Sequence, residues 1–208
     1  MPNSNEALID YLVRIGVLSD KRVEEVMRVV DRANFVPDEL KSSAYVDSPL
    51  PIGKGQTISA PHMVAVMTQY LKPEKGNKVL EVGAGSGYQA AILSVLVGDD
   101  GRVYAVERIP ELGAMARKNL RSYPNVKVFI GDGSKGLPEY APFDRILVSC
   151  AASRVPEPLK DQLLEGGRMV IPVGHPLSAD LILVEKKSGR IIETNLNFPC
   201  SFVPLVED

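Results

Sequence analysis

The chain has 208 residues, of which 45% are hydrophobic and 24% charged, as is usual for one globular domain and unlike a disordered chain. Lysine and arginine number 24 against 26 acidic residues, and a general nucleic-acid binder needs an excess of cations. No apolar run approaches the ~20 residues of a membrane span, and the N-terminus is unlike a secretory signal. We therefore expect a cytoplasmic protein that binds neither nucleic acid nor membrane.

Two cysteines and two histidines limit the chemistry further. Cys150 and Cys200 lie in apolar stretches, and two thiols do not make a disulfide scaffold. His62 and His175 are far apart in sequence and lack metal-type spacing. We expect two buried thiols and no metal site.

The first sixty residues predict helices followed by a long loop. Apolar residues at helical spacing predict a first helix over 8–15 and a second over 23–30, with Ser19 as a possible cap. Residues 37–55 are rich in proline, glycine and serine and predict an irregular loop, a feature that is often functional when ordered. A third helix is expected to begin near Pro61, since proline is tolerated at the first helical position.

From residue 78 onward, short apolar strands alternate with helices. Such repeated units predict an α/β fold with a mostly parallel, doubly wound sheet. A hairpin near the C-terminus adds an antiparallel strand. Strands are expected at 78–82, 102–107, 126–130, 143–149 and 168–172, helices at 88–97, 110–120 and 158–164, and the hairpin at 181–185 and 191–194.

A glycine-rich loop follows the first strand of this region. Gly83, Gly85 and Gly87 occupy alternate positions, which gives GxGxG and not the GxGxxG of dinucleotide binders. Glu81 precedes the first glycine by two residues, and Glu107 ends the next strand. In a doubly wound sheet, an acid at the second position can accept hydrogen bonds from a ribose diol. A bare strand-to-helix turn flanked by surface acids is the simpler alternative.

Glu81, the additional acid beside the loop, helps to identify the ligand. A carboxylate beside the loop repels phosphates and attracts an ammonium group, and S-adenosyl-L-methionine carries an ammonium and a ribose but no phosphate. Asp132 and Gly133 follow the third strand at the same sheet edge, where an Asp can accept from an adenine amino group. An ordinary Asp-Gly turn remains the alternative for this pair.

The segment before the third helix concentrates hydroxyls and an imidazole. Thr57, Ser59 and His62 lie where backbone N–H groups and the helix dipole favour an anion. On local evidence alone the simpler reading is favoured, in which Thr57 or Ser59 is a capping group and His62 an ordinary first-turn residue. The lone histidine is not evidence for a general base.

Together these motifs resemble the protein L-isoaspartate (D-aspartate) O-methyltransferase family over essentially the whole chain. The resemblance rests on segments 45–53 and 55–63, on the loop 81–88, and on 107–112, 131–133, 141–144 and 166–174 in the expected order. It implies transfer of a methyl group from S-adenosyl-L-methionine to the free α-carboxylate of L-isoaspartyl residues in damaged proteins. The ester then closes to a succinimide that returns partly to aspartyl. Activity on D-aspartyl residues is left open.

The resemblance also implies a fold and a set of site residues. The fold is a Rossmann-like class I methyltransferase with a seven-stranded sheet, in one domain over 1–208. Residues 1–60 would form an N-terminal extension at the substrate site, and residues 76–208 the cofactor-binding core. Ser59 would be catalytic, with Thr57, His62, Phe202, Val203 and Pro204 binding substrate, and Gln56, Thr57, Ser59, Glu81, Gly83, Gly85, Gly87, Glu107, Arg108, Asp132 and Gly133 binding the cofactor or its product S-adenosyl-L-homocysteine. No metal is implied, and a monomer is expected.

The expected mechanism needs few catalytic groups. A carboxylic acid with a pKa near ~4 is already ionised at neutral pH, so no general base is required. We expect Ser59 to donate a hydrogen bond that aims the carboxylate without neutralising it. Val206 and residues 198–201 differ from the pattern expected of the family, which concerns substrate contacts and not the reaction.

Three other readings stay open at this point. The first is a methyltransferase with another acceptor, such as a small molecule or a tRNA. The second is a nicotinamide-dependent oxidoreductase, which the GxGxG spacing and Glu81 disfavour. The third is a non-catalytic module that binds the cofactor or damaged protein without turnover.

Overall fold

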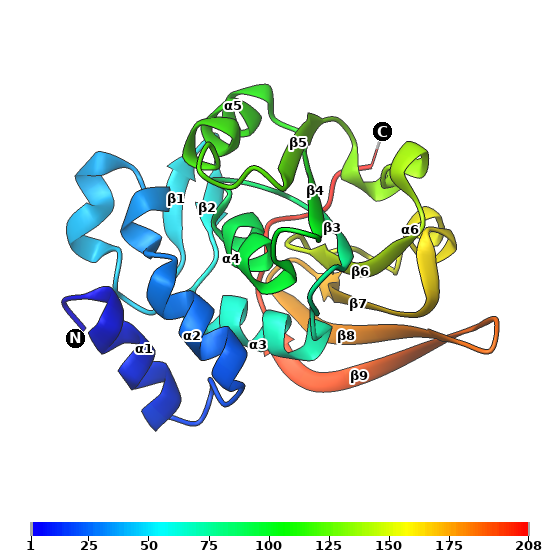
Figure 1. Cartoon of the computed structure of the whole chain (residues 1–208), viewed down its shortest axis with the longest axis horizontal. Coiled ribbons are helices and arrows are strands. Elements are labelled where there is room, and N and C mark those ends of the chain that lie inside the picture. The colour runs from blue at the N-terminus through cyan, green and yellow to red at the C-terminus, as the bar shows by residue number, and fades with distance from the viewer. Residues whose placement is uncertain (1, 208) are drawn as a thin grey trace.

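The structure is a computed structural model that describes residues 2–207 (Figure 1). Its α-helices are α1 (Asn5–Arg14), α2 (Lys21–Val29), α3 (Pro61–Leu71), α4 (Tyr88–Val97), α5 (Pro110–Asn119) and α6 (Glu157–Asp161). Its strands are β1 (Leu50–Gly53), β2 (Gln56–Ile58), β3 (Lys78–Val82), β4 (Arg102–Glu107), β5 (Val126–Ile130), β6 (Phe143–Val148), β7 (Leu163–His175), β8 (Ser178–Lys187) and β9 (Arg190–Cys200). Within residues 2–207, no helix is long and apolar enough to cross a bilayer.

Seven strands form one sheet in the order β5-β4-β3-β6-β7-β8-β9. The pairs from β5 to β7 are parallel, whereas β8 is antiparallel to both β7 and β9. This confirms the mostly parallel, seven-stranded sheet and the C-terminal antiparallel hairpin. The chain order reverses between β3 and β6, and ligands of open α/β sheets bind beyond the carboxyl ends of strands at such a point.

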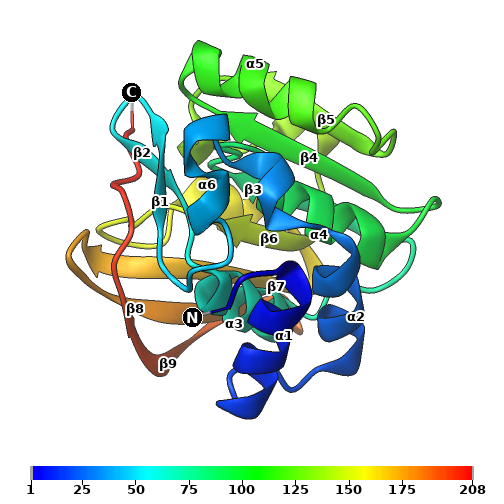
Figure 2. The ribbon, with the colours of Figure 1, turned by 90° about the vertical axis from the view of Figure 1, so that its left-hand side faces the viewer.

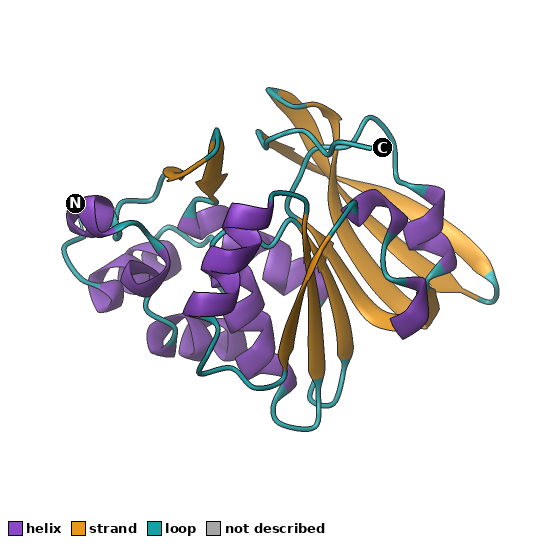
Figure 3. Ribbon diagram, turned by 90° about the horizontal axis from the view of Figure 1, so that it is seen from above, coloured by secondary structure: helices purple, strands orange, loops and turns teal. Residues whose placement is uncertain are grey.

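Helices cover both faces of the sheet (Figure 3). One face packs under α1 to α5, and its cluster of buried apolar side chains includes Val79 of β3. The opposite face packs against α6, and its cluster includes Leu80 and Val82 of the same strand. Since side chains alternate along a strand, Glu81 points to the face under α1 to α5 together with Val79.

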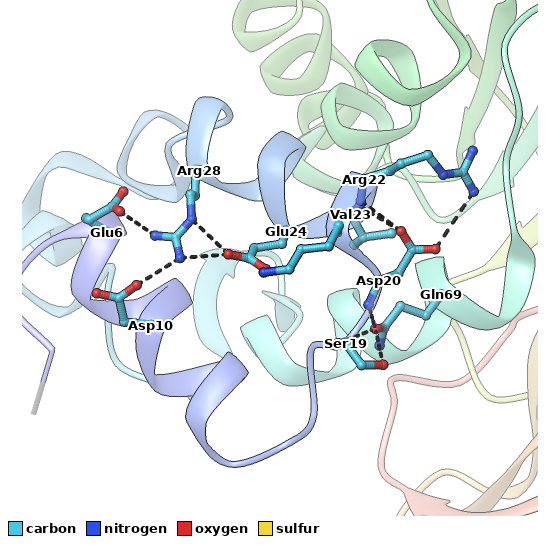
Figure 4. A network of polar contacts seen from close by, with 10 residues as sticks. Glu6, Asp10, Ser19, Asp20, Arg22, Val23, Glu24, Arg28 and Gln69 are labelled. Carbon is cyan, nitrogen blue, oxygen red and sulfur yellow. Dashed lines mark hydrogen bonds and ion pairs between the residues drawn. The ribbon is translucent and has the colours of Figure 1, made fainter.

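The N-terminal helices belong to the larger of these cores. Leu8 and Met27 are fully buried in the cluster that also contains residues of α3 and α4. On the surface, Arg28 pairs with Glu6, with Asp10 at 2.8 Å and with Glu24 at 3.0 Å (Figure 4). Exposed ion pairs contribute little on their own, so apolar burial is what attaches α1 and α2 to the sheet.

The predicted cap of the second helix was wrong by one residue. Asp20, not Ser19, caps α2, and its Oδ1 accepts from the amides of Arg22 and Val23. The amide and hydroxyl of Ser19 instead donate to Gln69 Oε1 at 2.7 and 3.2 Å, which ties this turn to α3 (Figure 4). Serine and aspartate are both good N-cap residues. Here Ser19 is engaged by Gln69, which is distant in sequence, and Asp20 is the cap.

The long irregular loop predicted over 37–55 was partly wrong. Residues 50–58 form the antiparallel hairpin β1–β2, in which Leu50 pairs with Ile58 and Pro51 with Thr57. Lys54 and Gly55 both have positive φ at its two-residue turn. Strands of four and three residues are too short to show a period in the sequence.

Two short 3-10 helices lie before that hairpin, and one predicted helix is shorter than expected. The 3-10 segments span Arg32–Phe35 and Asp38–Ser43. The helix expected over 158–164 ends at Asp161, and β7 begins at Leu163. Gly166 and Gly167, just beyond the end expected for that helix, lie inside β7.

Candidate active site

The glycine loop between β3 and α4 is a tight turn, and its backbone amides donate hydrogen bonds within the loop and to the end of β4. Gly83, Gly85 and Gly87 have φ of 89°, 52° and 92°, which L side chains rarely adopt. A Cβ at Gly83 would lie 2.9 Å from Cys150 Sγ. The amides of Gly83 and Ala84 donate to the carbonyl of residue 106 at 2.9 and 3.1 Å, and Gly87 donates to the carbonyl of Ala84 at 2.8 Å.

Glu107 fixes the middle of this loop. Its Oε2 accepts from the Gly85 amide and its Oε1 from the Ile109 amide, both at 2.9 Å, and the residue is largely buried. Each carboxylate oxygen keeps a second acceptor position, which suits a ribose diol. A diphosphate needs loop amides that point outward, and four of these amides are already engaged, which argues against a dinucleotide.

A pocket of about 640 Å³, counted with the space at its mouth, opens beyond the ends of β3 and β4; we name it the strand-edge pocket. It brings together many residues expected at a cofactor site or next to one. These are Gln56, Thr57, Gly83, Gly85, Glu107, Arg108, Gly133, Val203 and Pro204.

The walls of the strand-edge pocket also include residues that sequence reasoning did not select. Most are apolar, and they either follow a strand end or belong to the C-terminal segment, by which we mean residues 202–206. They are Val82, Val106, Ile109, Leu112, Cys150, Leu205 and Val206. Only their position in the sequence indicates these residues. Ile109 and Leu112 follow Glu107 at the end of β4, and Cys150 follows β6.

Two carboxylates expected at the cofactor site are not in the wall of the strand-edge pocket. Glu81 is fully buried, and neither of its oxygens has a hydrogen-bond partner within residues 2–207. Burial together with the charge of Glu107 raises its pKa well above the usual range. Asp132 caps a short 3-10 helix, where its Oδ1 accepts from the Ser134 amide at 2.9 Å and hydroxyl at 2.7 Å. Only its neighbour Gly133 reaches the pocket, so the roles of Glu81 and Asp132 stay predictions.

A second hollow, of about 1290 Å³ with its open side, contains the residues expected to bind substrate; we name it the lateral groove. The residues expected there are Thr57, Ser59, His62, Phe202, Val203 and Pro204. No lysine, arginine, aspartate or glutamate belongs to its described lining. A smaller hollow of about 280 Å³ joins Thr57 and Ser59 to Gly85, so Ser59 lies where the groove meets the glycine loop.

The C-terminal segment forms a wall shared by the strand-edge pocket and the lateral groove. Ala151 donates to the carbonyl of Val203 at 2.8 Å and accepts from the amide of Leu205 at 2.8 Å. Phe202 donates to the carbonyl of Pro176 at 3.0 Å. These bonds hold the segment beside the end of β6, on the same side of the molecule as the β1–β2 hairpin (Figure 2).

A buried arginine that sequence reasoning missed holds the segment leading to Ser59. Arg32 is 0% exposed, and its guanidinium donates to the carbonyls of Ala44 at 2.7 Å, Val46 at 3.3 Å, Ser48 at 2.9 Å and Ser59 at 3.1 Å. Burial lowers its pKa to about 10, so it is still charged at neutral pH. Carbonyl partners leave no trace in a sequence.

Asp47 lies between the carbonyls of residues 46 and 48 that Arg32 holds, and it is bonded to His62. Its Oδ1 accepts from the backbone amide of His62 at 2.9 Å and lies 2.9 Å from Nδ1 of the same residue. Burial opposes the charged form, but these hydrogen bonds lower the pKa of Asp47. Because Ala60 offers α3 no side-chain cap, Asp47 supplies one from the loop.

The comparisons with known proteins agree with this geometry. A family model described as protein-L-isoaspartate(D-aspartate) O-methyltransferase matches residues 3–208. A protein-L-isoaspartate O-methyltransferase of Methanopyrus kandleri is 55% identical over 98% of this chain and 91% of its own, and one of Ignicoccus hospitalis is 50% identical over the whole of both. The crystal structure of a Plasmodium falciparum protein assigned the same activity, in complex with S-adenosyl-L-homocysteine, matches with a TM-score of 0.88 at 29% identity and covers all of both chains. The chain belongs to the protein-L-isoaspartate(D-aspartate) O-methyltransferase family.

Proposed function

We propose that this chain transfers the methyl group of S-adenosyl-L-methionine to the free α-carboxylate of L-isoaspartyl residues in damaged proteins and peptides. The ester then closes to a succinimide, and part of it returns to aspartyl. One observation carries the proposal: Ser59 lies where the lateral groove, whose described lining has no lysine, arginine or acidic residue, meets the glycine loop of the strand-edge pocket.

The strand-edge pocket suits S-adenosyl-L-methionine, which supplies an activated methyl group on a sulfonium. The free acceptor positions of Glu107 match a ribose diol, and the loop amides that a diphosphate would need are engaged. A Cβ at Gly133 would lie 2.5 Å from Val82. Because glycine has no side chain, the backbone at this position can lie close to the strand end and line the pocket. Gln56, Thr57, Gly83 and Gly85 complete the proposed cofactor site, together with Arg108; Gly87, also expected there, does not line the pocket and faces Leu120.

Ser59 acts on a nucleophile that is already charged. The acceptor carboxylate is ionised at neutral pH, so the protein has to orient it and not to deprotonate it. The Ser59 hydroxyl donates one hydrogen bond, which aims an oxygen and leaves its charge in place. A lysine or arginine in the groove would bind the carboxylate more tightly and weaken it as a nucleophile, and neither belongs to the described lining.

Cys150 lines the strand-edge pocket without competing for the methyl group. Thiolates, not thiols, are the nucleophilic form of cysteine. Burial, reinforced by the charge of Glu107, raises the pKa of the Cys150 thiol to about 12. The sulfur therefore stays protonated at neutral pH, which protects the enzyme from methylating itself.

The remaining features of the function stay predictions. Residues 1–60 contribute the β1–β2 hairpin and Ser59 to the substrate side, and residues 76–208 form the cofactor-binding core. The enzyme acts in the cytoplasm as a monomer on protein substrates, and neither nucleic acid nor a membrane takes part.

The test is methyl transfer from labelled S-adenosyl-L-methionine to an isoaspartyl peptide and to its aspartyl twin, with a tRNA as a third acceptor. We expect base-labile label in the isoaspartyl peptide alone. Label in the RNA would favour a methyltransferase with another acceptor. Binding of S-adenosyl-L-homocysteine without any transfer would favour a non-catalytic module.

A further inference from the structure

The imidazole of His62 has one nitrogen held by the protein and one left for the lateral groove. Its Nδ1 lies 2.9 Å from Asp47 Oδ1, while no residue in 2–207 bonds to its Nε2. The side chain is 35% exposed and lines the groove beside Ser59.

Asp47 fixes which nitrogen of the His62 imidazole carries the proton. An ionised carboxylate can only accept hydrogen bonds, and the lowered pKa of Asp47 keeps it ionised, so Nδ1 must be the donor. The same Asp47 oxygen also accepts the His62 backbone amide, so the carboxylate cannot turn away without leaving the first turn of α3 uncapped. In a neutral ring, Nε2 then has a lone pair and no hydrogen.

Building on the proposed function, we propose that Asp47 is a positioning residue that holds His62 in the Nδ1–H tautomer and so presents a hydrogen-bond acceptor to the lateral groove. An acceptor repels the incoming carboxylate, which leaves the hydroxyl of Ser59 as its donor. The same lone pair accepts a backbone N–H of the substrate peptide. An Nε2–H donor would instead bind the carboxylate at His62, away from the glycine loop.

The surroundings of Asp47 are built to keep this arrangement. Arg32, fully buried, holds the carbonyls of Val46 and Ser48 on either side of Asp47. The lateral groove contains one other titratable side chain among its described lining, Cys200, and burial raises the pKa of that thiol to about 11. No charged side chain in the described groove lining therefore competes with Asp47 for the imidazole of His62.

The tautomer can be observed directly in the wild-type protein. The chain has two histidines, so ¹⁵N-histidine labelling gives two rings, and a His175→Ala variant assigns them. At pH 8.5 we expect one protonated nitrogen in His62, the Nδ1, and a free Nε2. A hydrogen on Nε2, whether in the other neutral tautomer or in a doubly protonated ring, would overturn the proposal.

The kinetic test uses two substitutions at Asp47. Asp47→Asn retains an oxygen that faces both His62 donors, so we expect the tautomer and kcat to stay near wild type. Asp47→Ala removes it, and we expect an Nε2–H ring with kcat for an isoaspartyl peptide lowered ~10-fold while KM does not rise, because the carboxylate binds in a misaligned position. Unchanged kcat with a raised KM in the folded alanine variant, or equal losses in both variants, would contradict the proposal.

These measurements separate the inference from the function on which it rests. Methyl transfer by the wild-type protein to the isoaspartyl peptide tests the function and does not depend on the tautomer. If Asp47→Ala fails to fold, the wild-type spectrum and the asparagine variant still decide.

Discussion

The two sides of the active site are held in place by different means. On the cofactor side, backbone amides of the glycine loop bond to the ends of the strands, to the carbonyl of residue 106 and to Glu107. On the substrate side, the buried side chain of Arg32 and the partly buried one of Asp47 hold Ser59 and His62. The cofactor side is therefore as rigid as the sheet, whereas the substrate side depends on a few replaceable side chains. Substitutions on the two sides should affect different quantities.

The largest effect is expected from Glu107→Ala. The change removes two charge-assisted hydrogen bonds to the loop and the acceptor for the ribose, at about 1.5–3 kcal/mol each. We expect the Kd for S-adenosyl-L-homocysteine, measured by calorimetry, to rise ~100-fold or more, since 1.4 kcal/mol is a factor of ten. Glu111→Ala, an exposed acid in the following helix, is the matched control and should bind normally. An unaltered Kd in Glu107→Ala would refute the assignment.

Arg32→Lys tests the substrate side. A lysine cannot reach all four carbonyls, so we expect a loss of about 2 kcal/mol in unfolding free energy. Because the Ser59 backbone shifts, kcat for an isoaspartyl peptide should also fall ~10-fold at temperatures where the variant is fully folded, with the Kd for S-adenosyl-L-homocysteine unchanged.

Arg28→Lys is the control for Arg32→Lys, because it alters a surface ion-pair cluster of the N-terminal helices far from the groove lining. It should leave kcat unchanged. If Arg32→Lys lowered stability alone and kept kcat, Arg32 would be structural and would not position Ser59.

The smallest effect is a change of pH dependence in Glu81→Gln. Glu81 has a raised pKa, so the folded protein keeps a proton that the unfolded chain loses above pH ~4.3. The contribution of Glu81 to stability should therefore decrease as pH rises above its unfolded-state pKa, until the folded-state pKa is reached. Glutamine cannot titrate, so the stability of the variant should increase relative to wild type as pH rises above that point in urea unfolding. Parallel stability curves would show that Glu81 is ionised in the folded protein.

Much of the cofactor side could be predicted from the sequence, because it follows strand ends. The turn at Gly83–Gly87 and the acid at Glu107 are set by the order of β3 and β4, which apolar runs reveal. Glu81 shows the limit of prediction from the sequence. The pattern does not reveal that this strand-end acid is buried on the face under α1 to α5 and lies outside the strand-edge pocket.

The substrate side was less accessible to prediction. Residue types and the family resemblance selected Thr57, Ser59 and His62, but neither selected the residues that hold them. Arg32 acts on carbonyls that lie 12 to 27 positions away, and carbonyls are the same in every residue. The β1–β2 hairpin was also missed, because Pro51 and two very short strands hide its alternation.

The most direct test of the account is a single-turnover measurement of methyl transfer by Ser59→Ala. With saturating S-adenosyl-L-methionine and an isoaspartyl peptide, we predict a rate lowered ~10- to 100-fold by the loss of alignment, with the Kd for S-adenosyl-L-homocysteine unchanged. Ser48→Ala, which removes an exposed hydroxyl just before β1, should react at the wild-type rate. A wild-type rate in Ser59→Ala would contradict the claim that its hydroxyl aims the acceptor carboxylate at the methyl group.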